Sequence, residues 1–353
     1  MATGGAPEPE EETVVLPHWV VLDRKGNTLC HNSLEAARVA VDKDKTAAPV
    51  DMDGGPSCYV SFTLAAPQKG ISCLNLHLPE GPPIALDTPP AYAHVRATDK
   101  DLVLFDISTP SQTDSYLVPP DLFVYTAAGS SPSVQRLPPF TRKRGRAFLM
   151  GNLPTGILRL KEQDRYIVAE LNVTGNNSMP AELCVFNSMT EKWELFLEMP
   201  APQPQDQGNG GLFPILLTTK DVLAFDDRFL CWVNYLRGVL LCDFTAAASP
   251  VLNFVPFPGG QDYPDKQHIA MGLANYYRRL SISQGMIRYI HIDNDFHETI
   301  HSDWQGIPPK RIQRRQQQLP HKITIWTLNS KFEWEVHCKI NLDCLSAQPL
   351  YRG

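Results

Sequence analysis

The chain has 353 residues, a formal net charge of −6 and a sequence pI near 5.9, so its overall field does not favour nucleic acid. No run approaches the ~18 consecutive apolar residues of a membrane span, and the acidic start lacks the basic region of a signal peptide. We therefore expect neither nucleic acid nor a membrane as a partner.

The chain begins with an acidic segment, residues 1–13, which contains four glutamates and predicts a disordered tail. Residues 14–345 form the predicted folded domain, and residues 346–353 form a C-terminal tail. Helical periodicity is poor throughout. The one candidate helix is Ser33–Val41, where Leu34, Ala37 and Val41 share a face, and we expect it to lie on a loop instead of in a core.

A hydrophobic residue followed by proline recurs at a nearly constant interval. The pairs are Leu78-Pro79, Leu137-Pro138, Met199-Pro200 and Val255-Pro256, and their prolines are 59, 62 and 56 residues apart. Proline is also abundant, at 31 residues, and it concentrates between the predicted strands, as its missing N–H requires. Self-similarity of this kind is typical of repeat and propeller architectures, in which each unit buries its apolar face against its neighbours.

Turn motifs support the same period, with turns near residues 65, 126, 187, 245 and 329. Phe186–Ser188 leads to Trp193, and Leu328–Ser330 leads to Trp334. An Asn-Ser turn followed by a tryptophan on the returning strand predicts a hairpin, because Asn tolerates the backbone angles of turns. We expect the two tryptophans at equivalent core positions. The turn near residue 65, within Cys58–Leu76, is a weaker copy.

The strands follow from alternation and from β-branched and aromatic content. Arg165–Val173, Phe229–Leu236 and Met286–Asp293 are dense apolar runs, which predict strands buried on both faces. Phe332–Lys339 alternates strictly and predicts a half-buried outer strand. Each unit thus resembles two inner strands followed by an outer hairpin, the composition of a four-stranded blade.

The predicted fold class is all-β: a β-propeller-like array of about five to six four-stranded blades with units of roughly 60 residues. The last unit has Ile340–Leu342 in place of a closing hydrophobic–Pro pair, so the prediction allows an array incompletely closed at the C-terminus.

The segment His297–His301 (HETIH) matches the H-E-x-x-H pattern, in which two histidines on one helical face bind zinc and the glutamate activates water. The preceding Met286–Asp293 predicts a strand, however, and Gly306–Pro309 ends any helix soon afterwards. The last interval between turns is 84 residues, so extra residues are inserted there, best placed at 294–320. We therefore expect HETIH in a polar surface loop.

Two basic runs, Arg142–Arg146 and Lys310–Arg315, are compatible with nuclear import, with anion binding or with solvated loop charge. The eight cysteines form no C-x-x-C motif, and Cys184, Cys231 and Cys242 fall within apolar strands. They predict buried free thiols in a reducing compartment, and hence a cytoplasmic and/or nuclear protein.

Three segments resemble a known family. They are Phe148–Leu158, Trp232–Asp243 and Trp19–Asp23. Together they resemble the domain of unknown function 1618 family, a plant family expanded in grasses, over roughly residues 15–345. The resemblance implies a layout similar to kelch and F-box-associated propellers. The family has no established activity, so the resemblance implies no catalytic, cofactor-binding or metal-binding residue.

Two functional hypotheses remain. The first is a non-enzymatic protein-interaction scaffold or adaptor in a plant cell, which binds an unidentified protein partner through the loops that connect the blades. The second is a zinc-dependent hydrolase acting through residues 297–301. We favour the first, and we expect no cofactor.

Overall fold

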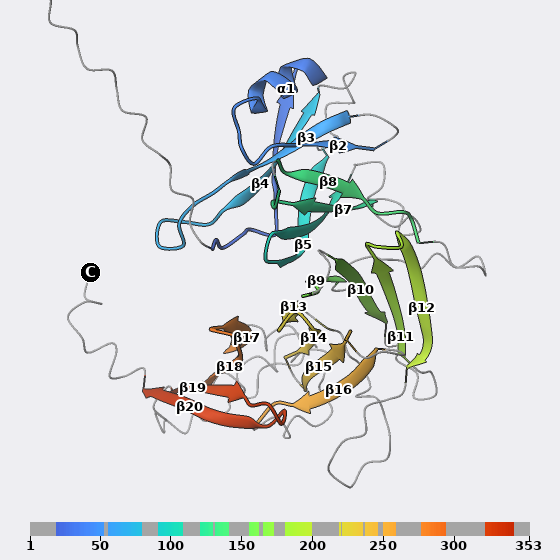
Figure 1. Cartoon of the computed structure of the whole chain (residues 1–353). Helices are drawn as coiled ribbons and strands as arrows, with labels where there is room; N and C mark the ends of the chain where they lie inside the picture. Colours follow the sequence, from blue (N-terminus) through green and yellow to red (C-terminus); the bar gives the residue numbers. More distant parts are fainter. Residues whose placement is uncertain are drawn as a thin grey trace, which may run out of the picture. The chain divides into compact units, whose positions relative to one another are not determined.

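The computed structural model describes residues 19–52, 56–79, 91–108, 121–129, 131–140, 155–161, 165–172, 181–199, 219, 221–235, 237–245, 250–258, 277–293 and 322–341. These residues form twenty strands and one helix, and the strands make five four-stranded sheets (Figure 1). The predicted all-β array of four-stranded units is therefore confirmed. Among the described residues, no helix is long and apolar enough to cross a membrane.

The chain divides into two compact units. The first unit comprises residues 1–96 and 103–139, and the second comprises residues 97–102 and 140–353. Most of the first two sheets belongs to the first unit, whereas the third, fourth and fifth sheets belong to the second.

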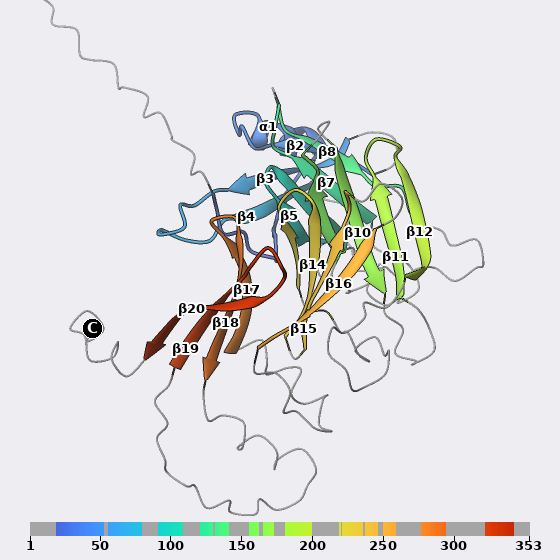
Figure 2. The same ribbon diagram turned by 60° about the horizontal axis from the view of Figure 1, so that its bottom comes forward.

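Four of the sheets follow the chain, with their strands side by side in sequence order. The second sheet contains β5 (Tyr92–Asp99), β6 (Leu102–Ser108), β7 (Asp121–Thr126) and β8 (Ser133–Arg136). The third contains β9 (Thr155–Arg159), β10 (Tyr166–Asn172), β11 (Ala181–Asn187) and β12 (Lys192–Met199). The fourth contains β13 (Asp221–Phe225), β14 (Phe229–Asn234), β15 (Gly238–Asp243) and β16 (Val251–Pro256). The fifth contains β17 (Arg278–Ser283), β18 (Met286–Asp293), β19 (Lys322–Leu328) and β20 (Trp334–Asn341), which Figure 2 shows from a second direction.

The first sheet has a different topology. Its strands are β1 (Asn27–His31), β2 (Ala48–Asp51), β3 (Pro56–Thr63) and β4 (Cys73–Pro79), in the spatial order β1-β4-β3-β2. β1 pairs in parallel with β4, and helix α1 (Leu34–Val41) lies in the connection from β1 to β2 at the opposite edge. The predicted hairpin within Cys58–Leu76 is present, since β3 pairs with β4 in antiparallel orientation. Its place as an outer hairpin was wrong, because both strands lie inside the sheet.

Helix α1 packs against the first sheet and contacts β1, β3 and β4. The predicted shared face is present, with Ala37 and Val41 buried, but the expectation that the helix lies on a loop was wrong. The helix begins at an N-cap, where the hydroxyl of Ser33 accepts a hydrogen bond from the Ala36 amide at 3.1 Å.

The predicted Asn turns are confirmed in the third and fifth sheets. The side-chain oxygen of Asn187 accepts a hydrogen bond from the Met189 amide at 3.0 Å, and that of Asn329 accepts one from the Lys331 amide at 2.9 Å. Such Asx turns reverse the chain without a glycine.

The two tryptophans that follow these turns hold matching places. Trp193 lies opposite Phe186, and Trp334 lies opposite Leu328, in each case the residue just before the Asn of the turn. Both tryptophans are half-buried and not in the core as expected, because β12 and β20 are edge strands.

Apolar clusters fill the spaces between neighbouring sheets within each unit. One joins the first and second sheets, another joins the third and fourth, and another joins the fourth and fifth. All six residues of β14 are buried, and so is every residue of β10 except the last. Both strands are therefore buried on both faces, as the dense apolar runs predicted. In β18, by contrast, only Ile287 and Tyr289 are buried among the described side chains. The prediction that this strand is buried on both faces was therefore wrong.

The third sheet approaches the fourth very closely at Gly156 of β9. A Cβ atom at this position would lie 2.5 Å from a methyl carbon of Val222 and 2.9 Å from one of Leu230. Real Cβ atoms do not approach so closely, so the glycine permits the packing of β9 on β13 and β14.

We predict that Gly156→Ala destabilises the protein by about 1–3 kcal/mol, because the added methyl group overpacks this contact. The measurement is the midpoint of urea denaturation. Gly70→Ala is the control, because a Cβ there meets nothing nearer than 3.6 Å, and its effect should stay within about 0.5 kcal/mol. Equal midpoints for the two variants would contradict the close approach.

Candidate functional site

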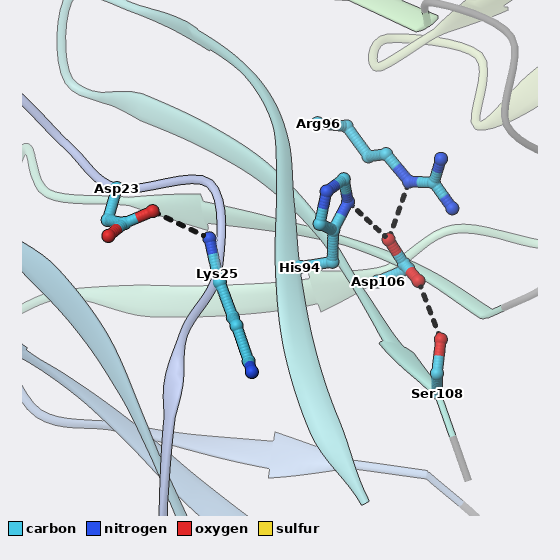
Figure 3. Close-up of polar contacts among 6 residues, drawn as sticks. All are labelled: Asp23, Lys25, His94, Arg96, Asp106 and Ser108. Atoms are coloured by element: carbon cyan, nitrogen blue, oxygen red, sulfur yellow. Dashed lines mark hydrogen bonds and ion pairs between the residues drawn. The ribbon is translucent and has the colours of Figure 1, made fainter. Parts of the chain in front are cut away.

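The second sheet carries a cluster of polar side chains on its first two strands, around the buried Asp106. His94 and Arg96 lie on β5, and Asp106 and Ser108 lie on β6 (Figure 3). We call these four residues the Asp106 cluster. The Nε of Arg96 donates to Oδ1 of Asp106 at 2.5 Å, and the hydroxyl of Ser108 donates to Oδ2 at 3.1 Å. The Nδ1 of His94 lies 3.6 Å from the same Oδ1.

Strand alternation explains why these side chains meet. Ala93 and Val95 of β5, with Phe105 and Ile107 of β6, belong to the apolar cluster between the first and second sheets. Successive residues of a strand point to opposite faces, so the polar residues at the even-numbered positions share the other face of the sheet.

Asp106 is ionised at neutral pH although its side chain is only 1% exposed. Burial alone would raise the pKa of Asp106, but the hydrogen bond to His94 and the charge and hydrogen bond of Arg96 outweigh it and lower the pKa. The Arg96 side chain is also largely buried, at 12% exposure, so each charge depends on the other for compensation.

The segment before β1 runs along the edge of the same sheet. Lys25 forms an antiparallel bridge with His94, and the Val95 amide donates to the Arg24 carbonyl at 2.7 Å. Asp23 accepts a hydrogen bond from the Lys25 amide and turns the chain there (Figure 3). The side of β5 next to His94 is therefore fixed by backbone pairing within the first unit.

This arrangement favours positioning over catalysis. Arg96 and Ser108 each bond one oxygen of Asp106, so the carboxylate is held in a fixed orientation with its charge compensated. His94 is oriented through its Nδ1, and its side chain remains 34% exposed. Within the described ranges, no group of three His, Cys, Asp or Glu side chains is placed to hold a metal ion.

A second polar cluster lies in the other unit, where the fourth and fifth sheets meet. The hydroxyl of Tyr235 donates to Oδ2 of Asp221 at 2.8 Å, and Nη1 of Arg279 lies 3.3 Å from the same oxygen. Burial raises the pKa of Tyr235, and the neighbouring charge of Asp221 raises it further. Here too the carboxylate is occupied by partners, which indicates a structural contact.

The motifs singled out in the sequence lie outside the described residues. These are the HETIH segment 297–301, the insertion 294–320 and the basic runs 142–146 and 310–315. The predicted surface loop stays a prediction, and the zinc site and the import signal stay alternatives to it. The Asp106 cluster was missed, although its residues form two polar pairs spaced i, i+2, His94 with Arg96 and Asp106 with Ser108.

One comparison with known proteins gives a match. Residues 232–351 match the family model described as "Protein of unknown function (DUF1618)". This match confirms the resemblance to the domain of unknown function 1618 family, over a shorter stretch than the sequence motifs suggested. No curated protein matches the chain.

We predict that Asp106→Asn destabilises the first unit by roughly 3–5 kcal/mol, because it leaves the Arg96 charge buried without compensation. Asp121→Asn is the matched control in the same sheet. Asp121 pairs with Arg136 at 3.0 Å in a more exposed position, and its loss should cost less than about 1 kcal/mol.

The pH dependence of stability provides a second test of the Asp106–Arg96 pair. The pKa of Asp106 is lowered on folding, so its stabilising effect is present above its unfolded value of about 3.9 and is lost as the pH falls below it. Denaturation midpoints measured from pH 6 to pH 3 should therefore fall less steeply in Asp106→Asn than in the wild type. Parallel curves would contradict the assignment.

Proposed function

We propose that the protein is a non-enzymatic interaction scaffold or adaptor of a plant cell, which acts in the cytoplasm and/or nucleus and binds another protein. The observation that carries this proposal is an exposed apolar patch at the N-terminal edge of the first sheet, formed by Trp19, Val21 and Ile71. We call it the Trp19 patch. The exposed fractions of these residues are 62%, 45% and 59%.

Backbone pairing places Val21 and Ile71 on neighbouring segments. Leu22 and Ser72 form a parallel bridge, and the Ser72 amide donates to the Val21 carbonyl at 2.7 Å. Ser72 is fully buried and Leu22 packs against the core, so both point inward. Alternation then directs Val21 and Ile71 outward on the same side. Trp19, which is also exposed, precedes Val21 by two residues in the sequence.

Exposed apolar side chains grouped in this way favour a protein partner. Single exposed hydrophobic residues are ordinary, but a contiguous group with a tryptophan is typical of binding surfaces, where tryptophan is enriched among the energetically important residues. The paired state of the Asp106 and Asp221 carboxylates supports the same proposal, because it gives these clusters a role in stability.

We predict that Trp19→Ala removes a specific set of neighbours from the proximity-labelling pattern of the protein in its native tissue. Met189→Ala is the matched control, since Met189 is 61% exposed on the β11–β12 turn, away from the patch in sequence. Both variants should keep the wild-type thermal midpoint, because neither side chain is buried. The proposal fails if Trp19→Ala and Met189→Ala give the wild-type pattern alike.

Metal analysis separates this proposal from the hydrolase hypothesis. A zinc-dependent enzyme acting through residues 297–301 requires stoichiometric zinc in the purified protein, and His297→Ala should abolish it. We expect the wild type and His297→Ala to contain the same substoichiometric zinc. Stoichiometric zinc that depends on His297 would favour the enzyme instead.

A further inference from the structure

The face of the first sheet opposite its apolar core carries a line of polar side chains. Val60, Phe62, Leu74 and Leu76 point into the cluster shared with the second sheet. The alternate residues point the other way, toward the side on which α1 packs. They are Asn27 and His31 of β1, Asn75 and His77 of β4, and Ser61 and Thr63 of β3.

Three of these residues form a continuous hydrogen-bonded chain. The hydroxyl of Ser61 lies 3.0 Å from Nε2 of His77, and Nδ1 of His77 lies 3.1 Å from Nε2 of His31. The two imidazole rings are nearly parallel, with centroids 5.3 Å apart and planes inclined by 19°. We call Ser61, His77 and His31 the histidine chain.

The contact between the two imidazole rings limits how many protons the histidine chain can hold. A hydrogen bond between two nitrogens needs a hydrogen on one and a lone pair on the other. Two neutral rings satisfy this, and so does a pair with one added proton. If both rings are charged, two N–H groups face each other at 3.1 Å and repel. Full protonation is therefore incompatible with the observed geometry.

Burial opposes proton uptake by His77, whose exposed fraction is only 6%. Removal from water lowers the pKa of His77, the charge of His31 lowers it further, and Asp44 opposes the shift. The unfolded chain thus binds protons more readily than the folded one. The stability that neutral His77 confers is present above its unfolded pKa, about 6.5, and is lost as the pH falls below that value.

Other ionisable groups lie on the elements around the histidine chain. They are Glu35 and Arg38 of α1, its C-cap Asp42, Lys43, Asp44 and Lys45 of the following turn, Tyr59 of β3 and Cys73 of β4. Glu35 and Arg38 pair with each other at 2.7 Å, and this hydrogen bond lowers the pKa of Glu35. Ordinary carboxylates titrate below pH 5, and thiol, phenol and amine groups titrate above pH 8, so the histidines dominate between these limits.

Helix α1 is the element that responds to a change beneath it. It has eight residues, fewer than the roughly 12–15 that an isolated helix needs to be even marginally stable in water. Of its side chains only Ala37 and Val41 are buried, so little apolar contact holds it. Its attachment depends on the state of the polar face that it covers.

We propose that the histidine chain is a pH-sensitive latch, which holds α1 against the first sheet at neutral pH and loosens it at acidic pH. Proton uptake by His77 and His31 breaks the contact between the rings and draws water to the charged face. The helix and the turn that follows then open, while the apolar core against the second sheet remains.

Amide hydrogen exchange of the full chain tests this latch. After correction for the intrinsic effect of pH on exchange, protection over residues 34–47 should fall between pH 7.5 and pH 5.5, by up to about tenfold for one histidine with an unfolded pKa of about 6.5. Protection of β3 and β4 should fall less. Equal loss over the whole first unit, or no loss over α1, would overturn the proposal.

Variants of the histidine chain test whether it causes the loss of α1 protection at acidic pH. His77→Gln cannot take up a proton but keeps hydrogen-bonding groups, so its α1 protection should not depend on pH in this range. His77→Asn, a shorter neutral side chain, provides the same test if His77→Gln does not fold. His94→Gln, in the second sheet, is the control and should keep the wild-type drop. A pH-dependent drop that persists in both chain variants would sink the proposal.

Discussion

The packing of apolar sheet faces against one another is the interaction on which the rest of this structure depends. A four-stranded sheet with an exposed apolar face is not stable alone, and here each described sheet shares a cluster with a neighbour in its unit. The fully buried Trp232 lies within one such cluster. On the opposite face of the second sheet, Asp106 is buried as well, and there its carboxylate persists only with its charge compensated.

The correct parts of the fold prediction rest mostly on residues that are close together in the sequence. The turns at Asn187 and Asn329 and the buried strand β14 are encoded by a few adjacent residues, and the structure has them where the sequence indicates. The first sheet was misjudged because its defining contact is not local. β1 pairs in parallel with β4 across about fifty residues, as in Asn27 with Asn75, and no neighbouring residue signals such a pairing.

The candidate site was harder to predict for a related reason. His94, Arg96 and Asp106 are ordinary polar residues in sequence, and their meeting depends on the register between β5 and β6. The histidine chain likewise joins three strands, with His31 and Ser61 brought to His77 only by the parallel pairing of β1 and the hairpin of β3 and β4. A motif of adjacent residues, such as HETIH, is easier to recognise in a sequence than residues that only the strand topology brings together.

The buried cysteines allow the opening of each unit to be measured separately. Cys58 lies in the core of the first unit, and Cys184, Cys231 and Cys242 are buried in the second. Burial raises the pKa of Cys58 to about 12 and raises that of the other three as well, so these four thiols are almost entirely protonated at neutral pH in the folded protein. Alkylation of these thiols therefore requires opening, and its rate at each cysteine measures how often the surrounding unit comes apart while the other stays folded.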